Sequence, residues 1–166
     1  MTTTPPPGTP PTTAATTSTA RPAPVDLSTP HGLRAAERLR TEEVVWLTTV
    51  DPSGTPQPTP VWFLWQPGDD GVGEVLLLSR PGTAKLRNVR RSPRVALHFG
   101  TDEVGDDVVV LVGRAAVDDG GLTAHQAAAF DARYAGPIRR LGMTPDQFRA
   151  EYAVLLRVVP DRLRGW

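Results

Sequence analysis

The chain has 166 residues, of which 39% are hydrophobic, and its 18 basic and 18 acidic residues cancel to a formal charge of zero. This composition is typical of one globular domain and gives no reason to expect nucleic acid or an anionic membrane as a partner. The absence of cysteine excludes disulfides, thiolate chemistry and thiolate-ligated zinc. No apolar run approaches the roughly 20 residues of a membrane-spanning helix, and no secretion signal is recognisable, so we expect a cytoplasmic protein.

The start of the chain differs in composition from the rest. Residues 1–28 consist mainly of Thr, Pro and Ala and show no apolar periodicity. Such a segment cannot bury enough apolar surface to fold, so we predict a disordered tail over 1–28 and one folded domain over 29–166. Thr29 followed by Pro30 is a good helix start, and the apolar spacing from Leu33 to Leu39 predicts a short amphipathic helix.

Strand patterns dominate the middle of the chain. Residues 44–50 form an apolar run that ends in a Pro- and Gly-containing turn at 51–54, as in a hairpin. The next strand, 57–65, contains Pro58 and Pro60, which lack N–H donors. Its first half must therefore lie at a sheet edge or a bulge, and such an irregular strand often lines a site.

Four further strands are predicted at 75–79, 94–99, 108–117 and 153–159, and Gly113 permits the bend or bulge that a barrel needs. A helix is expected to begin near Lys85 and to end at Ser92, and two more are expected at 123–134 and 144–152, each after a threonine cap. Most of the connections have the length of hairpin turns. The sequence therefore predicts a mainly β fold, a small six-stranded antiparallel barrel with flanking helices.

The segment from Ser79 to Asn88 carries the strongest chemical signal. Gly82 allows a tight turn and Thr83 can cap the following helix, whose free N–H groups and dipole favour an anion. Lys85 is the only lysine beside seventeen arginines, so either this position requires a compact ammonium group or the lysine is there by chance. Lys85 and Asn88 are three residues apart and share a helix face, which makes them the first candidate pair for a phosphate.

Other chemistry finds little support. The three histidines, His31, His98 and His125, lack metal-ligand spacing, so no metal site is expected. Motifs of serine hydrolases, phosphate-loop enzymes and Rossmann dinucleotide-binding proteins are missing from the sequence. The aromatic residues at 62, 63 and 65 either form a platform for a planar ring or pack in the core, and Trp166 is either disordered or docked in a groove.

Four segments of the chain resemble a known family: Gly54-x-Pro56 with Pro60-Val61-Trp62-Phe63, Leu77-Leu78-Ser79, Ala84-Lys85-x-x-Asn88-x-x-x-x-Pro93-Arg94-Val95, and Arg164-Gly165-Trp166. These residues are similar to those of the flavin/deazaflavin oxidoreductases with a split β-barrel, the pyridoxamine 5'-phosphate oxidase-like superfamily. The similarity is greater to the actinobacterial branch that uses the 8-hydroxy-5-deazaflavin coenzyme F420. It spans residues 30–166.

The resemblance implies a homodimer with two cofactors in clefts between the subunits. Ser79, Thr83, Lys85 and Asn88 match the segment around the cofactor phosphate, and Pro60, Val61 and Trp62 match the strand beside the ring, with Gln57 as a weaker match. No side chain is assigned a catalytic role, because the cofactor would perform the hydride chemistry.

We therefore expect an F420-dependent oxidoreductase that transfers a hydride from the reduced deazaflavin to an electron-poor small molecule such as an enone or a quinone. One alternative is an FMN-dependent enzyme of the same fold. The other is a non-catalytic protein that binds the deazaflavin or another planar ligand.

Overall fold

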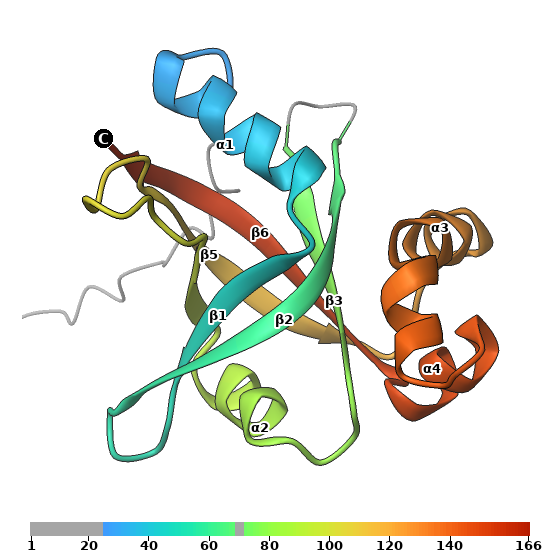
Figure 1. Cartoon of the computed structure of the whole chain (residues 1–166). Coiled ribbons are helices and arrows are strands. Elements are labelled where there is room, and N and C mark those ends of the chain that lie inside the picture. Colours follow the sequence, from blue (N-terminus) through green and yellow to red (C-terminus); the bar gives the residue numbers. More distant parts are fainter. Residues whose placement is uncertain (1–24, 69–71) are drawn as a thin grey trace, which may run out of the picture.

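Six antiparallel strands close into a barrel in the order β1-β2-β3-β6-β5-β4 (Figure 1). The computed structural model describes residues 25–68 and 72–166, so most of the predicted tail lies outside the described part. The strands are β1 Val44–Val50, β2 Pro56–Gln66, β3 Glu74–Ser79, β4 Arg94–His98, β5 Val109–Asp118 and β6 Val154–Gly165. This arrangement confirms the predicted six-stranded antiparallel barrel.

Four helices surround the barrel: α1 Pro30–Thr41, α2 Ala84–Arg91, α3 Ala124–Arg140 and α4 Pro145–Glu151. Figure 1 shows α1 across one end of the barrel, α2 near the opposite end, and α3 with α4 beside the barrel wall. The threonine caps at 29, 123 and 144 form as predicted, the last two within complete capping boxes.

The strand alternation separates two apolar clusters. Inward side chains such as Leu47 and Phe63 fill the barrel, together with Val25 and Leu27 from the segment ahead of α1. A second cluster, centred on Phe130, lies between the barrel wall and the helices α3 and α4. Because β2 contributes to both clusters through alternate residues, its outer face forms the floor on which α3 and α4 pack.

The strand β2 has two pairing partners in succession. It pairs with β1 from Pro56 to Trp62 but with β3 only from Phe63 to Gln66. Its first half is therefore bonded on one side alone, which confirms the predicted edge. Pro56, Pro58 and Pro60 are two residues apart, so their missing N–H donors fall on the same side of the strand.

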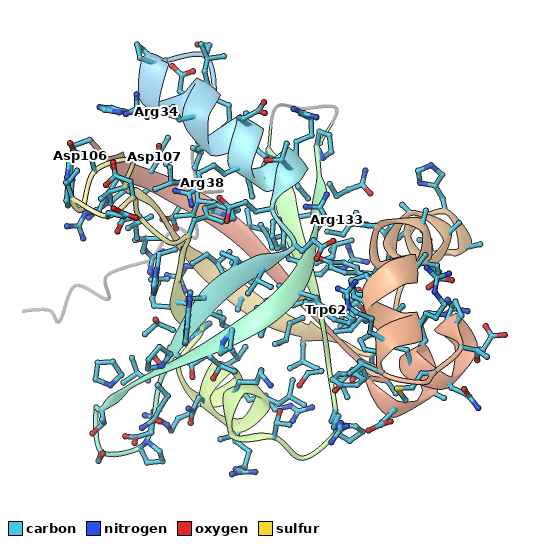
Figure 2. All side chains as sticks on the ribbon, viewed as in Figure 1. Arg34, Arg38, Trp62, Asp106, Asp107 and Arg133 are labelled. Carbon is cyan, nitrogen blue, oxygen red and sulfur yellow. The ribbon has the colours of Figure 1, made fainter. Side chains whose placement is uncertain are left out.

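α1 is tied to the loop between β4 and β5 by arginines (Figure 2). Arg38 Nη1 donates to the Asp107 carbonyl oxygen at 2.8 Å and lies 3.3 Å from its Oδ2, and Arg34 Nε lies 3.7 Å from Oδ1. Asp107 has a φ of 55°, which is uncommon for a residue with a side chain. These contacts hold the loop in that conformation against the helix.

Three elements differ from their predicted form. β6 runs to Gly165 instead of residue 159, because its second half pairs with the start of β5. α3 continues past Tyr134, whose φ of −107° and ψ of 15° mark a kink, and ends at Arg140. In α1, Leu33 is 61% exposed, and the buried face is formed by Gly32, Ala35 and Leu39.

Gly113 lies at an irregularity of the β5–β6 ladder. The register moves from Val112 opposite Arg162 to Gly113 opposite Pro160, so Asp161 is an extra residue on β6. A Cβ atom on Gly113 would lie 2.3 Å from the Val159 carbonyl oxygen. The bulge expected from the sequence is therefore present, and it leaves no room for a side chain.

We predict that Gly113→Ala lowers the free energy of unfolding by about 1–3 kcal/mol, because backbone atoms of two strands must move to relieve the clash. Gly100→Ala is the matched control, since an added Cβ there meets no atom within 4 Å, and it should change stability by less than about 0.5 kcal/mol. Urea unfolding of the two variants measures the difference. Equal stabilities would contradict the steric explanation.

Candidate functional site

The turn from β3 into α2 leaves the start of the helix open. Gly82 adopts a φ of 73°, as the tight turn requires, and Thr83 is the N-cap residue. The sequence predicted that the Thr83 hydroxyl caps this helix. Instead, the hydroxyl bonds to no helix N–H and lies 3.0 Å from Ser79 Oγ. The first N–H groups of α2 thus have no capping side chain and can serve an anion.

Lys85 stands beside this open helix start. Its Nζ atom lies 3.4 Å from Ser79 Oγ, and Ser79 itself is only 1% exposed. The lysine side chain is half-buried, and this burial lowers its pKa below the ordinary lysine value. Since Lys85 makes no ion pair within the described part of the chain, its charge is available to an anion from outside.

An apolar pocket of about 280 Å³ lies next to Lys85. We call it the aromatic pocket; it is lined by Val44, Pro60, Val61, Trp62, Leu78, Lys85, Phe130, Leu141, Phe148 and Tyr152. Figure 2 shows Trp62 on the side of the barrel that faces α3 and α4. The pocket therefore brings the predicted ring-side residues Pro60, Val61 and Trp62 together with the predicted phosphate ligand Lys85.

Trp62 is held firmly in this pocket by stacking. Its ring centroid lies 4.8 Å from that of Tyr134 at 6° and 5.1 Å from that of Phe148 at 24°. Phe148 also stacks on Tyr152 at 4.3 Å. Of the three aromatic residues in this strand segment, Trp62 lines the pocket, whereas Phe63 is buried in the barrel and Trp65 packs against the barrel core.

A second pocket, of about 450 Å³, lies on another flank of α2. We call it the arginine pocket; it is lined by Asp51, Pro52, Gln57, Ala84, Arg87, Asn88 and Arg91. Gln57 Nε2 donates to Asp51 Oδ2 at 3.0 Å, and Asn88 Nδ2 donates to Thr49 Oγ1 at 3.0 Å. Gln57 and Asn88 thus lie apart from the aromatic pocket, so Asn88 and Lys85 line different pockets.

Sequence reasoning missed the aromatic residues of the two C-terminal helices. Phe130 and Tyr134 are four residues apart in α3, and Phe148 and Tyr152 are four apart at the end of α4. Side chains at this spacing share a helix face, so two aromatic faces could have been read from the sequence. Their position over Trp62 could not be predicted from the sequence, because it depends on the packing of α3 on β2.

Tyr134 fixes that packing through its hydroxyl group. The side chain is fully buried, and the hydroxyl accepts a hydrogen bond from Phe63 N at 2.8 Å. Its oxygen also lies 2.7 Å from the Phe63 carbonyl oxygen and 2.9 Å from that of Glu43, so the one hydroxyl hydrogen is donated to these carbonyls. Burial raises the pKa of Tyr134, which keeps the hydroxyl protonated for this role.

The histidines lie outside both pockets. His98 stacks on Trp46 at a centroid distance of 6.2 Å and an angle of 5°. The described residues contain no group of three or more His, Asp or Glu side chains that could hold a metal ion. No helix within the described ranges is long and apolar enough to cross a membrane.

Comparison with known proteins identifies related sequences and structures. The family model described as "Pyridoxamine 5'-phosphate oxidase" matches residues 34–166. A solved structure named "F420 Reductase" is 25% identical, with 77% of this chain and 94% of that chain covered and a TM-score of 0.57. No match was found among proteins of curated function.

Two other solved structures share the fold. A putative pyridoxamine 5'-phosphate oxidase from Listeria innocua is 22% identical, covering 79% of this chain and 94% of its own, with a TM-score of 0.55. The heme storage protein HutZ from Vibrio cholerae is 20% identical, covering 80% and 92%, with a TM-score of 0.55.

We predict that Tyr134→Phe lowers the free energy of unfolding by about 1–3 kcal/mol, because buried backbone groups at Phe63 lose their partner. Tyr152→Phe removes the same atom from a half-buried ring whose hydroxyl bonds to no described residue, and it should cost less than about 0.5 kcal/mol. Chemical denaturation compares the two variants. A similar cost for both would show that the Tyr134 hydroxyl does not hold α3.

Proposed function

Because the chain belongs to the pyridoxamine 5'-phosphate oxidase family, we propose that it is an oxidoreductase that uses coenzyme F420 to reduce an electron-poor small molecule such as an enone or a quinone. The similarity to an F420 reductase over most of both chains supports the choice of the deazaflavin. The observation that carries the proposal is the position of Lys85, a half-buried cation without an acidic partner among the described residues, between an open helix start and an apolar pocket.

The residues present fit a planar cofactor with a phosphate. Pro60, Val61 and Trp62 give the aromatic pocket an apolar wall against which a flat ring could rest. Lys85 and the first N–H groups of α2 would hold the phosphate, and Ser79 and Thr83 would position the lysine from behind. When bound, the coenzyme supplies the hydride.

The protein's own contribution is orientation and exclusion of water. The side chains that line the aromatic pocket include no carboxylate and no imidazole, and most of them are apolar. The chain would therefore hold substrate and ring in contact in a dry environment, which raises the rate without a dedicated acid or base side chain.

A second copy of the chain would complete the site. Pro60, Trp46, His98 and Val110 form one row across four strands, in direct register on the outside of the barrel. Trp46 is 39% exposed and the neighbouring Val44 is 40% exposed. Since Val44 and Pro60 also line the aromatic pocket, a homodimer formed through this face would supply the wall that the pocket lacks.

Two alternative functions would place their ligand in the same aromatic pocket. An FMN-dependent enzyme is supported by the family itself and by the Listeria innocua neighbour. A non-catalytic protein that binds a planar ligand is supported by the shared fold with a heme storage protein.

We predict that coenzyme F420 binds in the aromatic pocket more tightly than FMN. Because Trp62 lines this pocket, a bound ring should quench tryptophan fluorescence, and parallel titrations with the two cofactors measure both affinities. Tighter binding of FMN would instead assign the protein to the flavin-dependent enzymes. If neither coenzyme F420 nor FMN binds saturably, the F420-dependent and the FMN-dependent oxidoreductase are both excluded.

We predict that Lys85→Ala weakens binding of the phosphate-bearing cofactor by about 1.5–3 kcal/mol, or tenfold and more, because a charge-assisted contact is lost. Since the Lys85 pKa is lowered, the ammonium group loses its proton at a lower pH than an ordinary lysine. The affinity of the native protein for the cofactor should therefore fall as the pH rises through the lowered pKa of Lys85.

Arg90→Ala serves as the control for Lys85→Ala, since Arg90 is exposed on the same helix and lines neither the aromatic nor the arginine pocket. It removes one positive charge and should leave the affinity nearly unchanged. If both variants lose the same affinity, the effect is one of general charge and Lys85 is no specific ligand.

A further inference from the structure

The arginine pocket contains two cations on one face of α2. Arg87 and Arg91 are four residues apart, so their side chains leave the helix in nearly the same direction. Arg87 Nη1 donates to the Gly82 carbonyl oxygen at 2.5 Å, and Arg91 Nη2 donates to that of Val50 at 2.6 Å. Each guanidinium group is thereby anchored through one of its five N–H donors, and the others can bind a ligand.

The positive charge of these two arginines is not neutralised within the described part of the chain. Other arginines are paired with acids, such as Arg94 with Asp161 and Arg157 with Glu74, but no ion pair is formed by Arg87 or Arg91. Uncompensated arginines that are each anchored by a backbone carbonyl oxygen at the edge of a pocket favour an anionic ligand.

The one carboxylate that lines the pocket is already engaged. Asp51 accepts hydrogen bonds from Ser53 N at 2.8 Å, Ser53 Oγ at 2.6 Å, Thr55 N at 3.0 Å and Gln57 Nε2 at 3.0 Å. These bonds lower the pKa of Asp51, and they engage its carboxylate oxygens with residues of the hairpin turn and the start of β2. Asp51 reduces the net charge of the pocket but does not occupy the arginines.

We infer that the arginine pocket is an anion-binding site for a ligand with two or more carboxylate or phosphate groups. Its volume of about 450 Å³ exceeds what one small ion needs, and two planar guanidinium groups can each bind an oxyanion through paired N–H bonds. Ala84 lines this pocket and Lys85 lines the aromatic pocket, so the first turn of α2 separates the two. The inference stands on this geometry and does not require the proposed function.

Isothermal titration with tripolyphosphate and with a tetraglutamate peptide at low salt tests the site. The double variant Arg87→Gln/Arg91→Gln should lose at least tenfold in affinity, and each single variant should lose part of it. Arg90→Gln, with the same change of charge outside both pockets, should lose less than twofold. Thermal unfolding of each variant confirms that it is folded.

Lys85→Ala separates the two sites, because it should change the affinity for the tetraglutamate peptide by less than twofold, whereas tripolyphosphate can also bind at Lys85. A large loss of peptide affinity in Lys85→Ala would place the anion at the start of α2 and overturn the inference. Absence of binding, or an equal loss in Arg90→Gln, would overturn it as well.

Competition identifies the source of the anion. FMN ends at its phosphate, whereas coenzyme F420 carries carboxylates beyond its phosphate. Displacement of the peptide by coenzyme F420 alone would mean that the site holds the acidic arm of the cofactor. If neither FMN nor coenzyme F420 displaces the peptide, the site binds a separate anion. Displacement of the peptide by FMN would overturn the inference. If neither cofactor binds at all, the proposed function fails while the anion site stands.

Discussion

The buried hydroxyl of Tyr134 is the contact on which the candidate site depends. The β1–β2 ladder ends with Val44 opposite Trp62, and the next pair would join Glu43 to Phe63. At that point the hydroxyl lies between the two strands, bonded to both backbone groups of Phe63 and to the Glu43 carbonyl oxygen. It satisfies backbone groups that would otherwise be buried without partners, which few side chains could do in so little space. Because the same residue stacks on Trp62, α3 cannot shift along β2 without breaking both contacts.

The alternation of β2 then decides what faces the pocket. Phe63 points into the barrel, and Trp62 with Leu64 points out toward α3 and α4. The half of the strand that precedes Trp62 is bonded to β1 alone, and its prolines leave the other side without N–H donors. A regular strand with a partner on both sides would close this edge of the wall. The proline-rich half keeps it open, which places Pro60 at the rim of the aromatic pocket.

Local signals predicted the elements of the fold, and tertiary contacts account for what was missed. Apolar runs and threonine caps marked all six strands and the helix starts, because capping and burial act within a few residues. The second half of β6 was hidden by Pro160 and the arginines after it, which become a strand only against β5. Thr83 looked like a capping residue, yet its hydroxyl turns to Ser79, a choice set by the end of β3. For the same reason, helix spacing grouped Asn88 with Lys85, whereas Thr49 holds the Asn88 amide in the structure.

The two flanks of α2 show why one chain would keep a single lysine among seventeen arginines. Lys85 is half-buried against an apolar pocket, where a compact ammonium group fits beside a helix start and its pKa responds to burial. Arg87 and Arg91 are exposed and anchored by backbone carbonyl oxygens, where a planar guanidinium group can use several donors at once. An arginine at 85 would need space for a wider group close to Ser79. A lysine at 91 would have one ammonium group for both the Val50 carbonyl oxygen and a ligand. The type of cation on each flank therefore follows from the surroundings that the barrel provides.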